Sequence, residues 1–242
     1  METMFNYKIF LYITTVCWLL ISFSIFFFVA DDKIILLGRE DGFYETAGAI
    51  FFLLAAILFF ILSVKTRTPY IYKKAFFILL GCIFLFAFFE EISWGQRIFN
   101  LTTPHFLQEI NMQKEINLHN LEIFSRATKD GKGKSFLLLM LSMDRLFSMF
   151  WFTYCCLLPL LYKFNSKAKI ALDRINIPIV PIFIGGLFFI NYLFAKVIEF
   201  YINPILFDSV NEIKESNFAF LFFIISVLFV KYKSSLSASS AI

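Results

Sequence analysis

Long apolar runs constrain this 242-residue chain more than any other feature of its sequence. A helix needs about 20 predominantly apolar residues to cross the hydrocarbon core of a bilayer. Several runs reach that length between clusters of charged residues, and only 17% of all residues are charged, against about 25% in ordinary soluble domains. The pattern predicts one integral membrane domain, an all-α, polytopic transmembrane helical bundle with spans over residues 9–30, 46–64, 75–94, 136–162, 178–202 and 212–230.

The charges and cysteines argue against two other classes of protein. The net charge is +4, but Lys and Arg fall between the apolar runs rather than on one basic face. We therefore expect the lipid bilayer as a partner and no nucleic acid. The four cysteines lie inside apolar runs without CxxC spacing, which favours small apolar fillers over a disulfide framework.

Positive charges in the short connections predict the orientation, because cytoplasmic loops carry the excess of Lys and Arg. The connections 65–74 and 163–177 and the C-terminal tail are basic, whereas 31–45 and 203–215 are acidic. We expect a multi-pass protein of the cytoplasmic (inner) cell membrane with both termini in the cytoplasm. The 95–135 loop carries six Lys or Arg residues, yet the alternation of six spans makes it extracytoplasmic.

A weak internal repeat supports this count of spans. "ETAGAIFFLLAAILFF" (45–60) aligns without gaps with "ESNFAFLFFIISVLFV" (215–230), and each segment follows a helix and an acidic connection. The alignment indicates that the first two and the last two spans are related units in the same orientation, as in parallel-repeat membrane folds. Coincidence in a chain this rich in Phe and Leu is the alternative.

Carboxylates recur at one depth along the predicted spans. At about 1.5 Å per helical residue, five spans place an acid about 24–31 Å from their cytoplasmic ends, near the outer boundary of a core about 30 Å thick. These acids are Glu45, Glu90, Asp144, Glu199 and Glu215. Three of them begin helices, where the dipole favours negative charge, but Glu90, its neighbour Glu91 and Glu199 end helices, where it does not. The last three therefore need partners or a function.

Partners for these acids are available within the sequence. Trp94 and Arg97 follow Glu90 at helical spacing, and Lys196 stands three residues before Glu199. We expect Arg145 to reach across to Glu90 or Glu91 on another helix. A purely structural charge network is the alternative to a functional site, although ionisable residues within membrane spans are functional by default.

Both histidines of the chain fall in the 95–135 loop. "TTPHFLQEI" (102–110), which contains His105, predicts a short amphipathic helix on the membrane surface. His119 stands among asparagines, and a hydrogen-bonding role is one hypothesis for it. A divalent metal is the other hypothesis, with the candidate ligands Glu90, Glu91, His119 and Asp144. No HExxH or HxxxH spacing supports the metal.

Three blocks of this region are more specific together than alone: "EDGFYE" (40–45), "EEISWGQRIF" (90–99) and "NMQKEINLHN" (111–120). They resemble a family of bacterial multi-pass membrane proteins that has no assigned activity. The resemblance covers about residues 38–124 and implies one shared site. Its members would be Glu40, Asp41, Glu45, Glu90, Glu91, Trp94, Gln96, Arg97, Asn117 and His119.

The paired glutamates are also similar to those of membrane-embedded glutamate peptidases of the prenyl-protein processing type. Those enzymes use an EExxxR motif together with histidines on later helices. Here Arg97 comes six residues after Glu91, and no later span contains a histidine. The peptidase assignment therefore fails, but paired glutamates in a semi-buried pocket are still suited to acid–base chemistry.

Three functions are compatible with these residues. The first is a hydrolase or transferase that acts on a lipid or lipid-linked substrate from an acidic, polar pocket near the outer leaflet. Its catalytic residues would be Glu45, Glu90, Glu91 and His119, and its substrate-binding residues Trp94, Gln96, Arg97, Asn117, Arg145 and Glu199. The second is a proton-coupled transporter that uses the same acids as a relay. The third is a non-enzymatic accessory subunit. Crowding of polar residues on one side of the membrane favours the enzyme.

Overall fold

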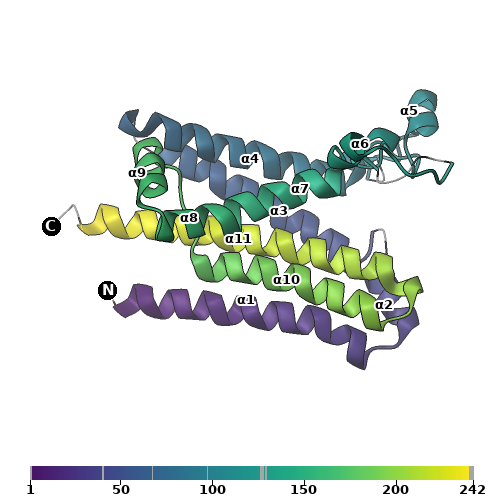
Figure 1. Ribbon diagram of the computed structural model, residues 1–242, viewed down its shortest axis with the longest axis horizontal. Coiled ribbons are helices and arrows are strands. Elements are labelled where there is room, and N and C mark those ends of the chain that lie inside the picture. Colours follow the sequence, from purple (N-terminus) through teal and green to yellow (C-terminus); the bar gives the residue numbers. More distant parts are fainter. Residues whose placement is uncertain are drawn as a thin grey trace.

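The computed structural model describes residues 2–39, 41–66, 68–96, 98–125, 128 and 130–239, which form a helical bundle (Figure 1). Its helices are α1 (Glu2–Phe28), α2 (Asp31–Leu37), α3 (Phe43–Lys65), α4 (Ile71–Glu91), α5 (His105–Ile110), α6 (Phe136–Met140), α7 (Met143–Trp151), α8 (Leu158–Phe164), α9 (Ser166–Ile175), α10 (Ile182–Tyr201) and α11 (Phe207–Ser239). A π-helical segment, Phe152–Leu157, joins α7 to α8, and 3-10 turns lie at Thr68–Tyr70, Ser93–Gly95, Glu122–Phe124 and Pro204–Leu206.

Among the described residues, six helical stretches are long and apolar enough to cross a membrane, which confirms the predicted all-α polytopic bundle. They are Asn6–Phe28, Phe43–Lys65, Ile71–Glu91, Met143–Phe164, Ile182–Tyr201 and Pro204–Lys231. The described residues contain no β-strand. The chain is therefore an integral membrane protein by the length and composition of its helices.

Two predicted spans begin later in the chain than expected. The predicted helix 136–162 is broken, because Ser142 adopts an extended backbone (ψ 140°) and α7 starts only at Met143. The predicted span 178–202 starts late, at Ile182, with Pro181 as the residue that precedes the helix. Proline has no N–H and disfavours helical backbone in the residue before it, so a segment with Pro178 and Pro181 stays extended.

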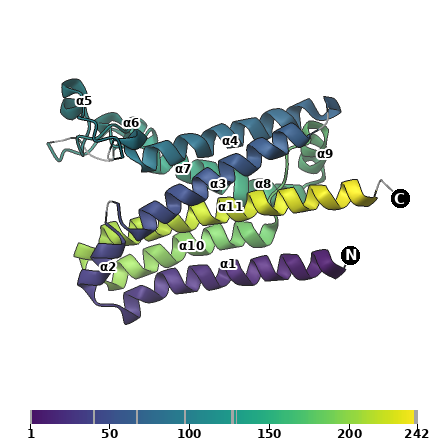
Figure 2. The same cartoon turned by 180° about the vertical axis from the view of Figure 1, so that it is seen from behind.

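α11 occupies the middle of the bundle and is the most buried of the six spans. It packs along α3, α10 and α1, while α4 lies on the other side of α3 (Figures 1 and 2). Phe218, Leu221, Phe222 and Ile225 of α11 are almost completely buried. These apolar contacts make up most of the packing around the central helix.

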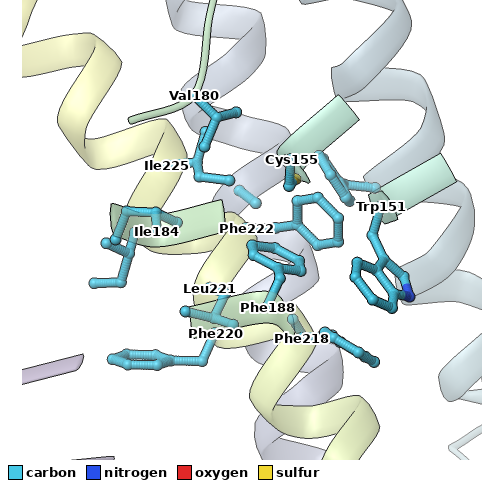
Figure 3. Close-up of a cluster of buried hydrophobic side chains, with 14 of the residues drawn as sticks. Trp151, Cys155, Val180, Ile184, Phe188, Phe218, Phe220, Leu221, Phe222 and Ile225 are labelled. Carbon is cyan, nitrogen blue, oxygen red and sulfur yellow. The ribbon is translucent and has the colours of Figure 1, made fainter. Parts of the chain in front are cut away.

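Aromatic rings fill most of this core. Phe222 of α11 stands 4.8 Å from Phe188 of α10 and 4.6 Å from Phe84 of α4, measured between ring centroids. Trp151 of α7 stacks on Phe218 at 5.0 Å. Figure 3 shows how Trp151 and Cys155 meet Phe188 of α10 and the rings of Phe218 and Phe222 of α11. The core therefore joins helices that lie far apart in the sequence.

The two segments of the predicted repeat lie next to each other. α3 packs against α11, and both run from the end of the bundle that carries α2 to the end that carries the termini (Figure 1). Gly48 lies at this contact, where an added Cβ would be 3.4 Å from the Cα of Ser216, an ordinary van der Waals distance. α1 and α10 likewise run in a common direction and are in contact. Common descent of the two units stays a prediction.

Candidate functional site

Glu90 ends α4 as a buried carboxylate whose two oxygens both accept hydrogen bonds. Its side chain is only 7% exposed. Oε1 accepts from Trp94 Nε1 at 2.6 Å, and Oε2 accepts from the backbone N–H groups of Leu118 and His119 at 2.7 and 2.8 Å. These donors compensate for the unfavourable position at a helix C-terminus. Glu90 therefore fastens the loop segment around His119 to the end of α4.

His119 forms a pair with the same carboxylate. Its Nδ1 lies 3.3 Å from Glu90 Oε2, and the imidazole side chain is 37% exposed. A hydrogen bond from Nδ1–H to a carboxylate leaves Nε2 as the nitrogen that can exchange protons. Burial lowers the pKa of His119, but the hydrogen bond and charge of Glu90, with the charges of Glu215 and Glu115, outweigh burial. The pKa of His119 therefore lies above its ordinary value of 6.5.

A left-handed turn places the residues that follow Glu90 and Glu91. Ser93, Trp94 and Gly95 have φ angles of 45°, 54° and 77°. Left-handed backbone costs about 1–2 kcal/mol for a residue with a Cβ, so two in succession need strong side-chain restraints. The indole of Trp94 is held by Glu90, and Ser93 Oγ donates to Glu115 Oε2 at 2.6 Å.

A second hydrogen-bond network holds residues 103–121, which we call the docked loop. Asn117 Nδ2 donates to Glu115 Oε2 at 2.9 Å, and Asn111 Nδ2 donates to Asn117 Oδ1 at 2.9 Å. Asn111 and Asn117 are both buried. Asn117 was a predicted site residue, and the structure gives it a positioning role within the loop.

Gln96 links the turn to both ends of the docked loop. Its Oε1 accepts from the backbone N–H of Ile116 at 2.7 Å, and its Nε2 donates to Thr103 Oγ1 at 2.7 Å. The second and third blocks of the sequence, 90–99 and 111–120, are thus brought together. Ser93, Thr103, Asn111 and Glu115 belong to this site but were missed, although the excess of Asn and Gln in 111–120 was a visible signal.

Glu91 lies among other carboxylates, apart from the partners of Glu90. It is half-buried, and the charges of Glu215, Glu212 and Glu45 act on it, together with that of Glu90. We call Glu45, Glu91, Glu212 and Glu215 the acidic group. Glu45 of α3 and Glu215 of α11 occupy matching positions in the two aligned segments. The acidic group therefore lies where α3, α4 and α11 meet.

The remaining predicted site residues either lie away from Glu90 and His119 or are not among the described residues. Glu199 pairs with Lys196 at 2.5 Å, as expected, on α10. Arg145 is exposed in the first turn of α7, next to Asp144. The predicted pairing of Arg145 with Glu90 or Glu91 is wrong, since no ion pair joins them among the described residues. Arg97 and Glu40 lie outside the described residues.

The predicted metal ligands do not come together as a set. In the part of the chain that the structure describes, no three His, Cys, Asp or Glu side chains are arranged to hold a metal ion. Glu90 and His119 are in contact, but Glu91 belongs to the acidic group and Asp144 starts α7. Asp144 therefore does not complete a site with Glu90 and His119.

Two surface hollows lie away from Glu90 and His119. A shallow pocket of about 250 Å³ at the start of α3 is lined by Asp41, Gly42, Phe43, Thr46, Ala47 and Ile50. A groove of about 210 Å³ between α1 and α10 is lined by Leu19, Leu20, Phe23, Ser24, Phe27, Ile190, Asn191 and Phe194. Asp41 and Glu45 are joined by a hydrogen bond from the Asp41 backbone N–H, next to the first pocket.

Comparison of the chain with protein-family models, with curated proteins and with solved structures found no match. The fold and the site define an integral membrane helical bundle with a Glu–His pair at one end.

Proposed function

We propose that this membrane protein is an enzyme that uses Glu90 and His119 as an acid–base pair on a lipid or lipid-linked substrate. One observation carries the proposal: a buried carboxylate holds Nδ1 of His119 while more than a third of the histidine side chain is exposed. A carboxylate in this position fixes the tautomer and the orientation of the ring. The buried carboxylate would position the ring, and the exposed ring would meet the substrate.

The chemistry of the pair fits hydrolysis or group transfer. His119 Nε2 would accept the proton of a water or acceptor hydroxyl as that oxygen attacks an acyl or phosphoryl centre. The proton would then pass to the leaving oxygen, and the ring would return to its neutral form. Because the pKa of His119 is raised, the neutral ring that acts as base becomes the major form only above an ordinary histidine pKa.

Exposed apolar side chains near the pair support a lipid substrate. Trp94 is 43% exposed and stacks on Phe89, with ring centroids 5.2 Å apart and an interplanar angle of 12°. Phe99 and Phe106, on either side of the start of the docked loop, are exposed as well. Aromatic residues at the end of a span are typical of the membrane–water interface, where an amphipathic substrate would present its head group.

The acidic group favours proton-coupled transport as a second candidate function. Carboxylates from α3, α4 and α11 converge on Glu91, as a proton-binding site inside a bundle requires. Two observations weigh against a path through the membrane. Phe59, Phe84 and Phe222 pack together deeper in the bundle. The buried hydroxyls of Ser63 and Ser226 donate to carbonyls of their own helices.

The experiment that tests the enzyme uses the purified full-length protein in lipid nanodiscs. Wild type would be incubated with a total bacterial lipid extract, and consumed and produced lipids would be identified by mass spectrometry. We expect His119→Gln to lower the conversion by about 10²-fold or more, the usual share of one acid–base group. His105→Gln is the matched control, because His105 is exposed and pairs only with Glu109 among its described contacts.

Each result of this experiment decides between the candidate functions. Conversion by wild type and His105→Gln but not by a stably folded His119→Gln supports the enzyme. Equal conversion by all three proteins removes His119 from the chemistry. If folded wild type converts no lipid, proton flux in vesicles is measured next: flux that Glu91→Gln abolishes favours the transporter, and no flux favours the accessory subunit.

A further inference from the structure

α9 was predicted as part of a basic connection, 163–177, but it is a separate helix of ten residues. Asn165 caps its start, with Oδ1 accepting from the backbone N–H of Ala168 at 3.0 Å. Asn176 ends it in a left-handed conformation with φ 57°. Both ends are therefore fixed by local chemistry that does not depend on the rest of the bundle.

The position of α9 is that of a helix lying on a membrane surface. α8 ends at Phe164 and α10 begins at Ile182, and these residues are also the ends of two membrane spans. α9 stands between them, at the end of the bundle that carries both termini, with its axis across the bundle axis (Figures 1 and 2). It therefore lies at the level where the hydrocarbon core gives way to lipid head groups.

One face of α9 is attached to the bundle. Ala168 and Leu172 are half-buried, and α9 packs against α8. Asp173, the acidic residue of the helix, accepts a hydrogen bond from Tyr162 Oη at 2.9 Å. Lys169 places its Nζ 5.6 Å from the ring centroid of the same tyrosine. The helix is thus oriented, and its single acid already has a donor.

The exposed residues of α9 combine positive charge with apolar surface. Lys167, Lys169 and Arg174 are exposed, and Ile170 between them is 61% exposed. Phe164, just before the helix, is 75% exposed. Basic residues around an apolar centre, on a helix in the plane of the interface, match the pattern of helices that bind anionic membranes.

We infer that α9 is a binding platform for the phosphate groups of anionic lipids in the leaflet that faces the two termini. Lys167, Lys169 and Arg174 would contact the head groups, and Ile170 and Phe164 would reach the upper part of the acyl chains. The inference is independent of the Glu90–His119 pair, which lies at the opposite end of the bundle.

The test measures lipid binding to the purified protein by native mass spectrometry. Phosphatidylglycerol and phosphatidylcholine are titrated separately, and an apparent dissociation constant is obtained for each bound lipid. We expect wild type to prefer phosphatidylglycerol, and the triple variant Lys167→Gln/Lys169→Gln/Arg174→Gln to bind it about tenfold more weakly or worse. Lys33→Gln/Lys114→Gln/Lys132→Gln removes the same charge from exposed positions at the opposite end and should bind like wild type.

Two further measurements distinguish lipid recognition from a folding defect and from binding of a free anion. Lys167→Arg/Lys169→Arg/Arg174→Lys keeps the charge and should keep the affinity, which separates recognition from a folding defect. Excess inorganic phosphate should leave lipid binding largely intact if the occupant is a lipid rather than a free anion. Equal affinity of wild type for the two lipids, equal weakening by both charge-removing variants, or full competition by phosphate would overturn the inference.

Discussion

At the scale of single residues, Glu90 and Glu91 serve different surroundings although they are neighbours on one helix. Successive residues of a helix do not face the same partner, so Glu90 meets the docked loop and Glu91 meets the acidic group. The sequence showed that both acids oppose the helix dipole. It could not show the partners, because the donors at Leu118 and His119 come from a loop with no periodic pattern.

Removing the charge of Glu90 should lower the pKa of His119. In wild type we expect this histidine to titrate above 6.5, because the effect of Glu90 outweighs burial. In Glu90→Gln burial remains while the charge is lost, so the midpoint moves to lower pH. Carbon-13 NMR of labelled histidine measures both midpoints in detergent, with exposed His105 as the internal reference. Glu115→Gln should give a smaller decrease, and an unchanged midpoint in Glu90→Gln contradicts the pair.

The same pair should make stability depend on pH. A histidine with a raised pKa in the folded state binds its proton more tightly there than in the unfolded chain. Its contribution is therefore complete below about pH 6.5 and is lost as the pH rises through the folded-state pKa. The difference in melting temperature between wild type and His119→Gln should be largest in acid and should shrink towards alkaline pH. A difference that grows with pH has the wrong sign for this mechanism.

At the scale of helices, one glycine permits the crossing of α10 over the π-helical segment 152–157. A Cβ on Gly185 would lie 2.1 Å from the carbonyl oxygen of Cys155, whereas one on Gly186 would meet nothing within 4 Å. Gly185→Ala should therefore lower the free energy of unfolding by about 1–3 kcal/mol. Gly186→Ala should be neutral or slightly stabilising. Thermal unfolding of both variants in detergent checks this, and equal effects would place the contact elsewhere.

A chain of hydrogen bonds connects α1, α11 and α10 inside the membrane. Trp18 Nε1 donates to Asn217 Oδ1 at 2.9 Å, and Asn217 Nδ2 donates to Asn191 Oδ1 at 3.0 Å. Asn191 Nδ2 continues to the carbonyl of Lys214 at 3.0 Å. A double-mutant cycle with Asn191→Leu and Asn217→Leu should give a coupling energy of about 0.6 kcal/mol and at most about 1.7. Additive effects of the two substitutions would show that the chain stabilises nothing as a unit.

The sequence predicted the presence of each membrane span more accurately than the residues at which it begins and ends. Apolar runs of about 20 residues specify spans on their own, and all six were found. The break before Met143 and the late start of α10 depend on single backbone conformations at Ser142 and Pro181. α9 was not predicted as a helix, because ten residues with three exposed basic side chains have the composition of a basic loop. The site was predicted in part: Glu90, Trp94, Gln96, Asn117 and His119 were named, but Ser93, Thr103, Asn111 and Glu115 were not, because a loop has no periodic pattern from which its hydrogen bonds follow.

At the scale of the whole molecule, basic and acidic connections lie at opposite ends of the bundle. Both termini and α9 share one end, and α2, α5 and α6 share the other (Figure 1). The 95–135 loop, despite its positive charges, lies with α2 because six spans require it. The basic connections 65–74 and 163–177 and the C-terminal tail together outweigh this one loop. We therefore expect the end with the termini in the cytoplasm.

Cysteine labelling in intact cells tests this orientation. In a protein whose four native cysteines are replaced, Lys132→Cys in the loop should react with a membrane-impermeant maleimide. Lys169→Cys on α9 should react only after the membrane is opened, and both positions are exposed. The opposite pattern would place Glu90 and His119 at the cytoplasmic leaflet and move the search for substrates there. Labelling of both positions in intact cells would contradict the single span, residues 143–164, that separates the two sites, or the integrity of the bundle.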